Sequence, residues 1–200
     1  MRNTDEYIIN GTRYPSPSEI LSALSFNKGM MSIPEDILEA AAERGNRVHD
    51  WCEHFLLGKR SPIPAAKDEE LRCSAFMDWF DETEPEVVDV EKLVFSRRIK
   101  VAGKLDILVK EPDGKLAIVD IKTGSSPKTY TSYPIQQAFY SIAVREMADL
   151  DYHPARYILQ LPKDGSYNVK HLDDPEDFEI AEAAARVMWR LIDWKEIKLD

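Results

Sequence analysis

The hydrophobic pattern changes its period along the chain, and this change separates helical segments from extended ones. Apolar residues recur at intervals of three and four, the spacing of an α-helix, over residues 34–57, 67–82, 134–148 and 174–197. Runs rich in branched apolar residues, typical of strands, cover residues 86–96, 98–110, 115–123 and 155–172, the last of them as a hairpin. Helices first, then strands mixed with two further helices, predict one α/β domain without an internal linker.

The start of the chain carries two short-range signals of local structure. Residues 6–14 read as a small hairpin whose turn is Asn10-Gly11, a pair that suits the left-handed conformations of a two-residue turn. Ser16 can cap the helix that follows, and Glu19 completes a capping box with it. We therefore expect a hairpin and a short helix before the first long helix.

One predicted strand breaks the apolar rule of a buried sheet. The sequence LAIVDIKTG, residues 116–124, places Asp120 and Lys122 in an otherwise hydrophobic run. The preceding Pro112-Asp113-Gly114 predicts a three-residue hairpin loop with the glycine in the left-handed position. Side chains alternate along a strand, so the pairs that this register places opposite each other are Glu111 with Lys115, Asp106 with Asp120, and Lys104 with Lys122. The other face of the hairpin is wholly apolar and is expected to pack on the core: Leu105, Ile107, Val109, Ala117, Val119 and Ile121.

Opposed carboxylates at the end of this hairpin indicate a cation site. Side chains that face each other in a sheet lie about 5 Å apart, and like charges at that distance are destabilising. A divalent cation between Asp106 and Asp120 removes the conflict, and hard oxygen ligands select magnesium, manganese or calcium. The alternative from the residues alone is a set of ion pairs, in which Lys104 or Lys122 neutralises Asp106.

Two helices carry further polar residues at helical spacing. His49 and Glu53 are four residues apart and share one helix face, so His49 could bind the cation with Glu53 beside it, or the two could form a solvated pair. Gly45, one turn earlier, predicts close approach of another backbone. In the later helix, Gln136 and Tyr140 could hold a phosphate or a base, or Tyr140 could belong to the core and Gln136 to the surface.

Composition narrows the classes of protein. The net charge of −10 is a poor global match to a polyanion, although residues 90–140 carry nine basic and five acidic side chains. Two cysteines, Cys52 and Cys73, argue against a disulfide framework and against a four-cysteine metal site. The low cysteine content favours a reducing, intracellular setting. No apolar run is long enough to span a membrane, and the first residues lack the apolar core of a signal peptide.

The order and spacing of four motifs resemble the PD-(D/E)XK nuclease superfamily, and its RecB-like and phage-type exonuclease branch in particular. The motifs are RGNRVH with Glu53 after it, GKLD at 103–106, DIK at 120–122 and QQAFY at 136–140. The resemblance implies an α/β, restriction-endonuclease-like core in which helices flank both faces of a central mixed β-sheet. It also implies one domain over 1–200, with a helical part over about 15–85 and a nuclease core over about 86–200.

The resemblance also implies a role for each matched residue. Catalysis would fall to Asp106, Asp120 and Lys122. The metal ligands would be His49, Asp106, Asp120 and the backbone carbonyl of Ile121, with Glu53 as a helper. DNA contacts would come from Gln136, Tyr140, Arg44 and Thr123. The implied cofactor is Mg²⁺ or Mn²⁺, as one or two ions, and no iron–sulfur cluster is expected.

By the same resemblance, the implied activity is a metal-dependent DNA exonuclease that hydrolyses phosphodiester bonds at linear or single-stranded ends. Phage-type recombination, repair or replication is the expected setting, in the host cytoplasm if a phage encodes the protein. Expected partners are DNA and a recombination or single-strand-binding protein, with an oligomer also compatible and no membrane. The alternatives are a structure-specific endonuclease and a non-catalytic DNA-binding subunit. Asp120 departs from the glutamate common at its position, and Leu105 from proline.

Overall fold

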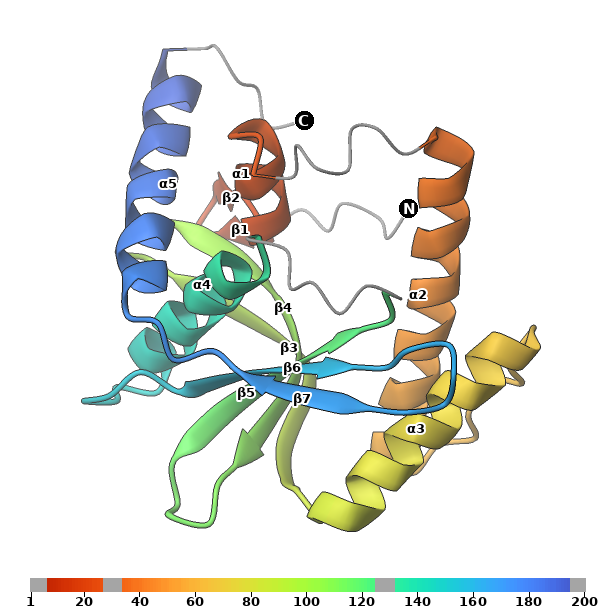
Figure 1. Cartoon of the computed structure of the whole chain (residues 1–200). Coiled ribbons are helices and arrows are strands. Elements are labelled where there is room, and N and C mark those ends of the chain that lie inside the picture. Colours follow the sequence, from red (N-terminus) through yellow and green to blue (C-terminus); the bar gives the residue numbers. More distant parts are fainter. Residues whose placement is uncertain (1–6, 27–33, 125–131, 195–200) are drawn as a thin grey trace.

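A five-stranded mixed sheet forms the middle of the structure, and helices cover both of its faces (Figure 1). The structure is a computed structural model that describes residues 7–26, 34–124 and 132–194. The helices are α1 (Pro17–Ala23), α2 (Glu35–Leu56), α3 (Lys67–Thr83), α4 (Ser132–Met147) and α5 (Glu176–Asp193). The strands are β1 (Tyr7–Ile9), β2 (Thr12–Tyr14), β3 (Glu86–Ser96), β4 (Val101–Lys110), β5 (Leu116–Lys122), β6 (Ala155–Gln160) and β7 (Asn168–His171).

The topology of the sheet confirms the predicted fold class. The strand order is β3-β4-β5-β6-β7, and every neighbouring pair is antiparallel except β5 and β6. Parallel neighbours need a crossover connection, and α4 supplies it between β5 and β6. The β1–β2 hairpin forms a separate two-stranded sheet. The chain is therefore an α/β protein with a central mixed sheet.

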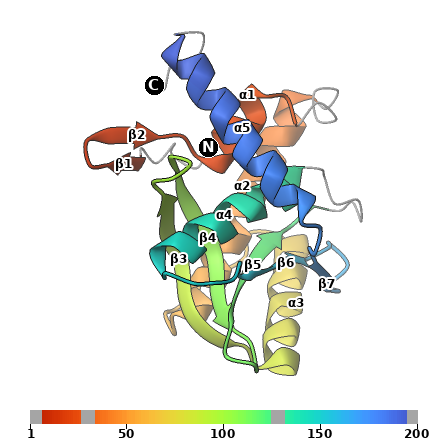
Figure 2. The same cartoon turned by 90° about the vertical axis from the view of Figure 1, so that its left-hand side faces the viewer.

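Separate hydrophobic clusters hold the helices on the two faces of the sheet. On one face, α2 and α3 pack on β4, β5 and β6. On the other face, α4 packs against the sheet, and α1 and α5 pack on α4. Figure 2 shows α4 in front of the sheet, with α5 above α4. The ends of β4 and β5 consequently lie where elements of both layers can reach them.

The predicted hairpin register of β4 and β5 is confirmed. Glu111 N–H donates to the Lys115 carbonyl at 2.8 Å, and the ladder continues through Val109↔Ala117 to Ile107↔Val119. Gly114 has φ 86°, the left-handed conformation expected of it. The ladder ends at Ile107↔Val119, one position before Asp106 and Asp120.

The predicted division of this hairpin into two faces is wrong at Leu105. Ile107 and Val109 join the cluster under α2 and α3 as expected, but Leu105 packs in the cluster with Leu108 on the α4 side. The regular alternation of side chains requires a regular extended backbone. Here β4 has lost its pairing to β5, and its other neighbour β3 contains Glu91 with φ 49°.

The ends of the predicted elements agree with the structure to within a few residues. The hairpin turn at Asn10-Gly11 is confirmed, with both residues at positive φ, and Ser16 caps α1 in a capping box with Glu19. The strand expected from residue 98 begins at Val101, because residues 97–100 form the turn from β3. Residues 195–197 of the last predicted helix lie outside the described residues. No helix in the described part of the chain is both long enough and apolar enough to cross a bilayer.

Candidate active site

One large cleft gathers the predicted site residues. It has a volume of about 820 Å³ and is lined by α2, by Lys104 and Asp106 in the first half of β4, by the end of β5, and by the start of α4. Its lining includes all of the residues predicted for catalysis, metal binding and DNA contact: Arg44, His49, Glu53, Asp106, Asp120, Ile121, Lys122, Thr123, Gln136 and Tyr140. Asp106 and Asp120 therefore share one cavity, as the hairpin register predicted.

Asp106 is held by the strand beside it. Its Oδ2 accepts a hydrogen bond of 2.7 Å from the backbone N–H of Ile121. Its Oδ1 lies 3.4 Å from Nδ1 of His49, which α2 brings over the strand end. The Asp106 side chain is only 8% exposed. A buried carboxylate with one fixed oxygen and a histidine near the other is arranged to bind a cation.

Glu91 of β3 joins this pair, and the sequence analysis missed it. One ligand atom each from His49, Glu91 and Asp106 lie within 4.8 Å of one another. The pairs Val90↔Ile107 and Lys92↔Leu105 flank the position at which Glu91 meets Asp106. The geometry of the turn at residues 97–100 sets the register of β3 against β4, and that register would have placed Glu91 opposite Asp106. The turn carries no glycine or proline to indicate its geometry.

Asp120 and Lys122 form a buried ion pair. Nζ of Lys122 lies 2.6 Å from Oδ2 of Asp120, whose side chain is 5% exposed. The pKa of Asp120 is raised to about 6. Burial is the largest cause and the neighbouring Asp106 adds to it, whereas Lys122 acts in the opposite direction. Burial opposes the charge on Lys122, but the carboxylates of Asp120 and Asp106 outweigh this and raise the pKa of Lys122. The lysine therefore carries its charge inside the cleft.

Ion pairs, the alternative to a cation site in the sequence analysis, are also present at this strand end. Nζ of Lys122 pairs with Asp120, and Lys104 lies 3.7 Å from Glu91. Oδ1 of Asp106 lies 3.4 Å from Nδ1 of His49. The carboxylates thus outnumber the lysines at this strand end, which is the condition that favours a bound cation.

The start of α4 places an amide and a phenol against the lysine. Oε1 of Gln136 accepts a hydrogen bond of 3.3 Å from Nζ of Lys122. Tyr140 is 7% exposed and belongs to the hydrophobic cluster under α4, yet it also lines the cleft. Burial raises the pKa of the Tyr140 phenol, which stays protonated. Tyr140 therefore belongs to the core, as one alternative predicted, and its contact with a phosphate or base stays a prediction.

Gly45 marks a close approach, although not the one predicted. A Cβ atom at Gly45 would lie 3.2 Å from Oγ1 of Thr123, so α2 approaches a side chain rather than a backbone. Arg44, one residue earlier, lies with its Nε 3.5 Å from Asp68 of α3. The absence of a side chain at Gly45 lets α2 lie against the strand end and brings His49, one turn later, into the cleft.

A buried arginine that the sequence analysis did not single out closes the end of β5. Arg72 of α3 is 1% exposed. Its Nη1 donates to the carbonyl of Thr123 at 2.5 Å and also to the carbonyl of Leu161 after β6. These bonds fix the backbone directly after Lys122 and so hold the lysine's strand in place.

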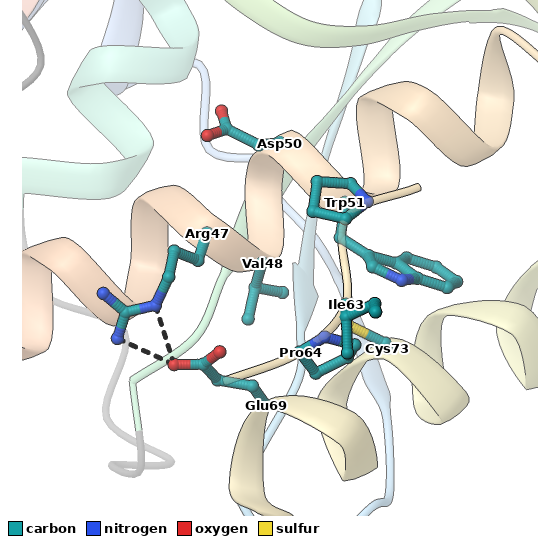
Figure 3. Close-up of a pocket in the computed structure, with 9 residues that line it drawn as sticks. Arg47, Val48, Asp50, Trp51, Ile63, Pro64, Glu69 and Cys73 are labelled. Atoms are coloured by element: carbon teal, nitrogen blue, oxygen red, sulfur yellow. Dashed lines mark hydrogen bonds and ion pairs between the residues drawn. The ribbon is translucent and has the colours of Figure 1, made fainter. Parts of the chain in front are cut away.

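A smaller pocket lies beside the cleft, between α2 and α3 (Figure 3). It encloses about 70 Å³ and is lined by Trp51, Ile63 and Cys73 among others. The polar groups at its edge bind each other, since Nε and Nη2 of Arg47 donate to Oε1 of Glu69 at 2.9 and 2.8 Å (Figure 3). Glu69 is 2% exposed. The ion pair between Arg47 and Glu69 beside this pocket holds α2 against α3 and thereby helps to position His49 on α2.

Among the described residues, much of the basic excess of residues 90–140 is paired with carboxylates. Six of its basic side chains lie within ion-pair distance of carboxylates: Lys92 with Asp89, Arg98 with Glu182, Lys104 with Glu91, Lys110 with Glu86, Lys115 with Asp113 and Lys122 with Asp120. DNA binding would therefore depend on the cleft more than on a general positive surface.

The donor set of the cleft fits a hard divalent cation. Carboxylate oxygens dominate it, and a single imidazole nitrogen accompanies them, a combination that suits magnesium or manganese. Nδ1 of His49 is buried and has no hydrogen-bond partner among the described residues. An orphaned buried ring nitrogen beside two carboxylates is expected where a metal is bound.

Solved structures share this fold. LHK-Exo, an alkaline exonuclease from Laribacter hongkongensis, is 16% identical, and the match covers 91% of this chain and 89% of that chain with a TM-score of 0.52. A protein from Eubacterium rectale, provisionally described as an exonuclease, is 15% identical, with 100% and 86% covered and a TM-score of 0.58. At such identities the likeness establishes the fold. No curated protein sequence matches the chain.

The fold defines the class of protein as α/β with a restriction-endonuclease-like architecture. The sequence gives the family. A sequence profile of the PD-(D/E)XK nuclease superfamily matches residues 65–199, more than half of the chain. The chain belongs to the PD-(D/E)XK nuclease superfamily, as its motifs predicted.

Proposed function

We propose that the protein is a Mg²⁺- or Mn²⁺-dependent DNA exonuclease that hydrolyses phosphodiester bonds at linear or single-stranded ends. The observation that carries the proposal is the convergence of Asp106, Asp120 and Lys122 in one cleft of a PD-(D/E)XK chain. An uncharged cleft of the same shape could hold DNA without cutting it. Two buried carboxylates and a charged lysine are costly to keep there, which argues against a purely DNA-binding subunit.

His49, Asp106, Asp120 and the carbonyl of Ile121 would hold the metal, with Glu53 as helper, and Glu91 joins them on the grounds of its distance. A bound divalent cation neutralises phosphate oxygens and makes a coordinated water more acidic. Lys122 stays protonated beside Asp120, so its ammonium can stabilise negative charge that develops on the phosphate.

Residues around the metal site would hold the DNA strand. Gln136 and Tyr140 line the cleft next to Lys122, and their amide and phenol groups can donate hydrogen bonds to a phosphate. Arg44 and Thr123 line the same cleft from α2 and from the end of β5. Of these four residues, Arg44 carries the positive charge, and its Nε also lies 3.5 Å from Asp68.

The choice of an exonuclease follows from likeness. LHK-Exo is described as an alkaline exonuclease and has been solved in complex with dAMP, a mononucleotide of the kind that an exonuclease releases. We extend that activity to this chain, as one domain, and place it in phage-type recombination, repair or replication. Cys52 and Cys73 are free and buried, which is compatible with the reducing cytoplasm where DNA lies. A recombination or single-strand-binding protein, or further copies of the chain, are the partners proposed.

A digestion series tests the proposal. Linear strands labelled at the 5′ or the 3′ end and closed single-stranded circles are incubated with Mg²⁺, Mn²⁺ or chelator. An exonuclease releases mononucleotides from the linear strands only, and only with a metal. Cutting of circles would instead indicate the structure-specific endonuclease. Absence of cleavage from every substrate, together with tight DNA binding, would favour the non-catalytic subunit. The variant Asp120→Asn serves as the inactive control.

A further inference from the structure

Two consecutive glutamines of α4 hold the two members of the Asp120–Lys122 pair. Gln136 accepts the bond from Nζ of Lys122 described above. Gln137, the next residue, donates from Nε2 to Oδ1 of Asp120 at 2.8 Å. The first amide thus presents its oxygen to the ammonium and the second presents its NH₂ group to the carboxylate. Each glutamine therefore turns toward its partner the end of its amide whose partial charge is opposite to the charge of that partner.

Packing alone does not explain why a glutamine occupies position 137. Gln137 is 0% exposed, and an amide buried so completely loses its hydrogen bonds to water. Its Oε1 has no hydrogen-bond partner among the described residues, so the bond to Asp120 is the contact that its polar end makes there. An apolar side chain of the same length would fill this position on α4 with a smaller desolvation cost.

The bond to Gln137 fixes the orientation of the Asp120 carboxylate. Oδ1 is committed to Nε2 of Gln137, while Oδ2 faces Lys122 at 2.6 Å. A carboxylate held at one oxygen cannot rotate freely about its Cβ–Cγ bond. In metal sites, such outer partners orient the ligands, and their removal typically lowers metal affinity or activity by about 10- to 100-fold.

We propose that Gln137 is a positioning residue that orients Asp120 for metal binding. This inference rests on the proposed function for the identity of Asp120 as a metal ligand. It predicts that Gln137 acts on the affinity for the metal, whereas Gln136, whose amide faces Lys122, does not share this role. α4 would thereby contribute to the metal centre without supplying a ligand.

Direct binding of Mn²⁺ to the full chain without DNA tests the proposal, with electron paramagnetic resonance reporting the free ion. Gln137→Met keeps the length of the side chain but removes the donor, and Gln137→Asn keeps the amide but shortens it. The matched control is Ser141→Ala, which removes a buried hydrogen bond of the same helix, from Ser141 Oγ to the Pro154 carbonyl at 2.9 Å, away from the site. Thermal unfolding in chelator verifies that each variant is folded.

The expected result is at least a 10-fold rise in the Mn²⁺ dissociation constant for both Gln137 variants and less than a 2-fold change for Ser141→Ala. The Mn²⁺ concentration that gives half-maximal cleavage should rise by the same factor, and saturating Mn²⁺ should restore most of the rate. Folded Gln137 variants with wild-type Mn²⁺ affinity would overturn the proposal, as would an equal loss in Ser141→Ala. Because binding is measured without DNA, a wild-type protein that binds Mn²⁺ but cuts nothing would contradict the proposed function and leave this inference testable.

Discussion

The side chain of Asp106 takes the place of a backbone partner for Ile121. The β4–β5 ladder ends at Ile107↔Val119, and the N–H of Ile121, two residues further along β5, donates to Oδ2 of Asp106. The strands therefore open where the site begins, and a carboxylate enters the opening. Along a strand, successive carbonyls point to opposite sides, and the Lys122 carbonyl accepts from Leu161 on the β6 side. The Ile121 carbonyl consequently faces the side of Asp106.

Asp106→Asn separates the charge of this residue from its structural bond. The amide oxygen can still accept from Ile121 N–H, so thermal stability in chelator should remain within a few degrees of wild type. DNA cleavage should fall at least 100-fold, because the cation loses a charged ligand. Asp106→Ala should in addition lose about 1–3 kcal/mol of stability, since it leaves the buried Ile121 N–H without an acceptor. Equal unfolding midpoints for the two variants would contradict the structural role of the carboxylate.

Lys122→Met tests whether the buried ammonium acts in the chemical step. The change keeps the length of the side chain and removes the charge beside Asp120. Loss of a group that stabilises developing charge typically lowers the rate by about 100- to 1,000-fold. Single-turnover cleavage at saturating metal should show this loss, whereas binding of Mn²⁺ should persist. A variant that cuts at the wild-type rate would remove Lys122 from the proposed mechanism.

The pKa of Asp120 predicts how the metal-free protein responds to pH. Burial raises this pKa from 3.8 to about 6, so the folded state holds a proton that the unfolded state releases. The contribution of the protonated group to stability is complete below about pH 4 and is lost as the pH rises through about 6. Asp120→Asn, which resembles the protonated acid, should therefore stabilise the metal-free protein by about 1–3 kcal/mol at pH 8.

The same variant should show no such gain at pH 4, where Asp120 of the wild type is already protonated. Thermal unfolding in chelator at the two pH values measures the difference. The variant should also lose the stabilisation that Mn²⁺ gives to the wild type at pH 8. A uniform gain at both pH values would mean that ionisation of Asp120 is not its cause.

Local signals in the sequence predicted much of this site, because one hairpin carries Asp106, Asp120 and Lys122. The Pro112-Asp113-Gly114 loop determines the register of β4 and β5, and the register brings Asp106 to Asp120 and Lys122. The capping box at Ser16 and the turn at Asn10-Gly11 are equally local. In each case, the residues that determine the geometry lie within a few positions of one another.

What the sequence did not reveal depends on contacts between distant elements. Glu91 meets Asp106 only through the pairing of β3 with β4, and its φ of 49° is a backbone state that its residue type does not indicate. Gln137 faces Asp120 because α4 crosses the end of β5. Leu105 was assigned to the wrong face, because strict alternation was assumed at the point where the ladder opens.

A substitution at Gly103 tests how tightly the ring of Tyr140 packs against β4. A Cβ atom at this position would lie 3.0 Å from Cε1 of Tyr140 and 3.1 Å from Cδ of Pro17, closer than ordinary contact distance. Gly103→Ala should therefore displace the Tyr140 ring or shift α1 away from β4. Overpacking of this kind costs about 1–3 kcal/mol, and chemical denaturation can measure it. Cleavage should weaken as well, since Tyr140 lines the cleft.

The control for this change is Gly124→Ala. Gly124 is exposed and also lines the cleft, but a Cβ atom there would meet nothing within 4 Å. Its free energy of unfolding should therefore stay within about 0.5 kcal/mol of wild type, as is usual for surface positions. If Gly103→Ala were as stable as Gly124→Ala, the contact between Tyr140 and β4 would be looser than the distances indicate. Tyr140 would then be free to move toward a bound strand, and its role in the cleft would have to be one of adaptation rather than of fixed support.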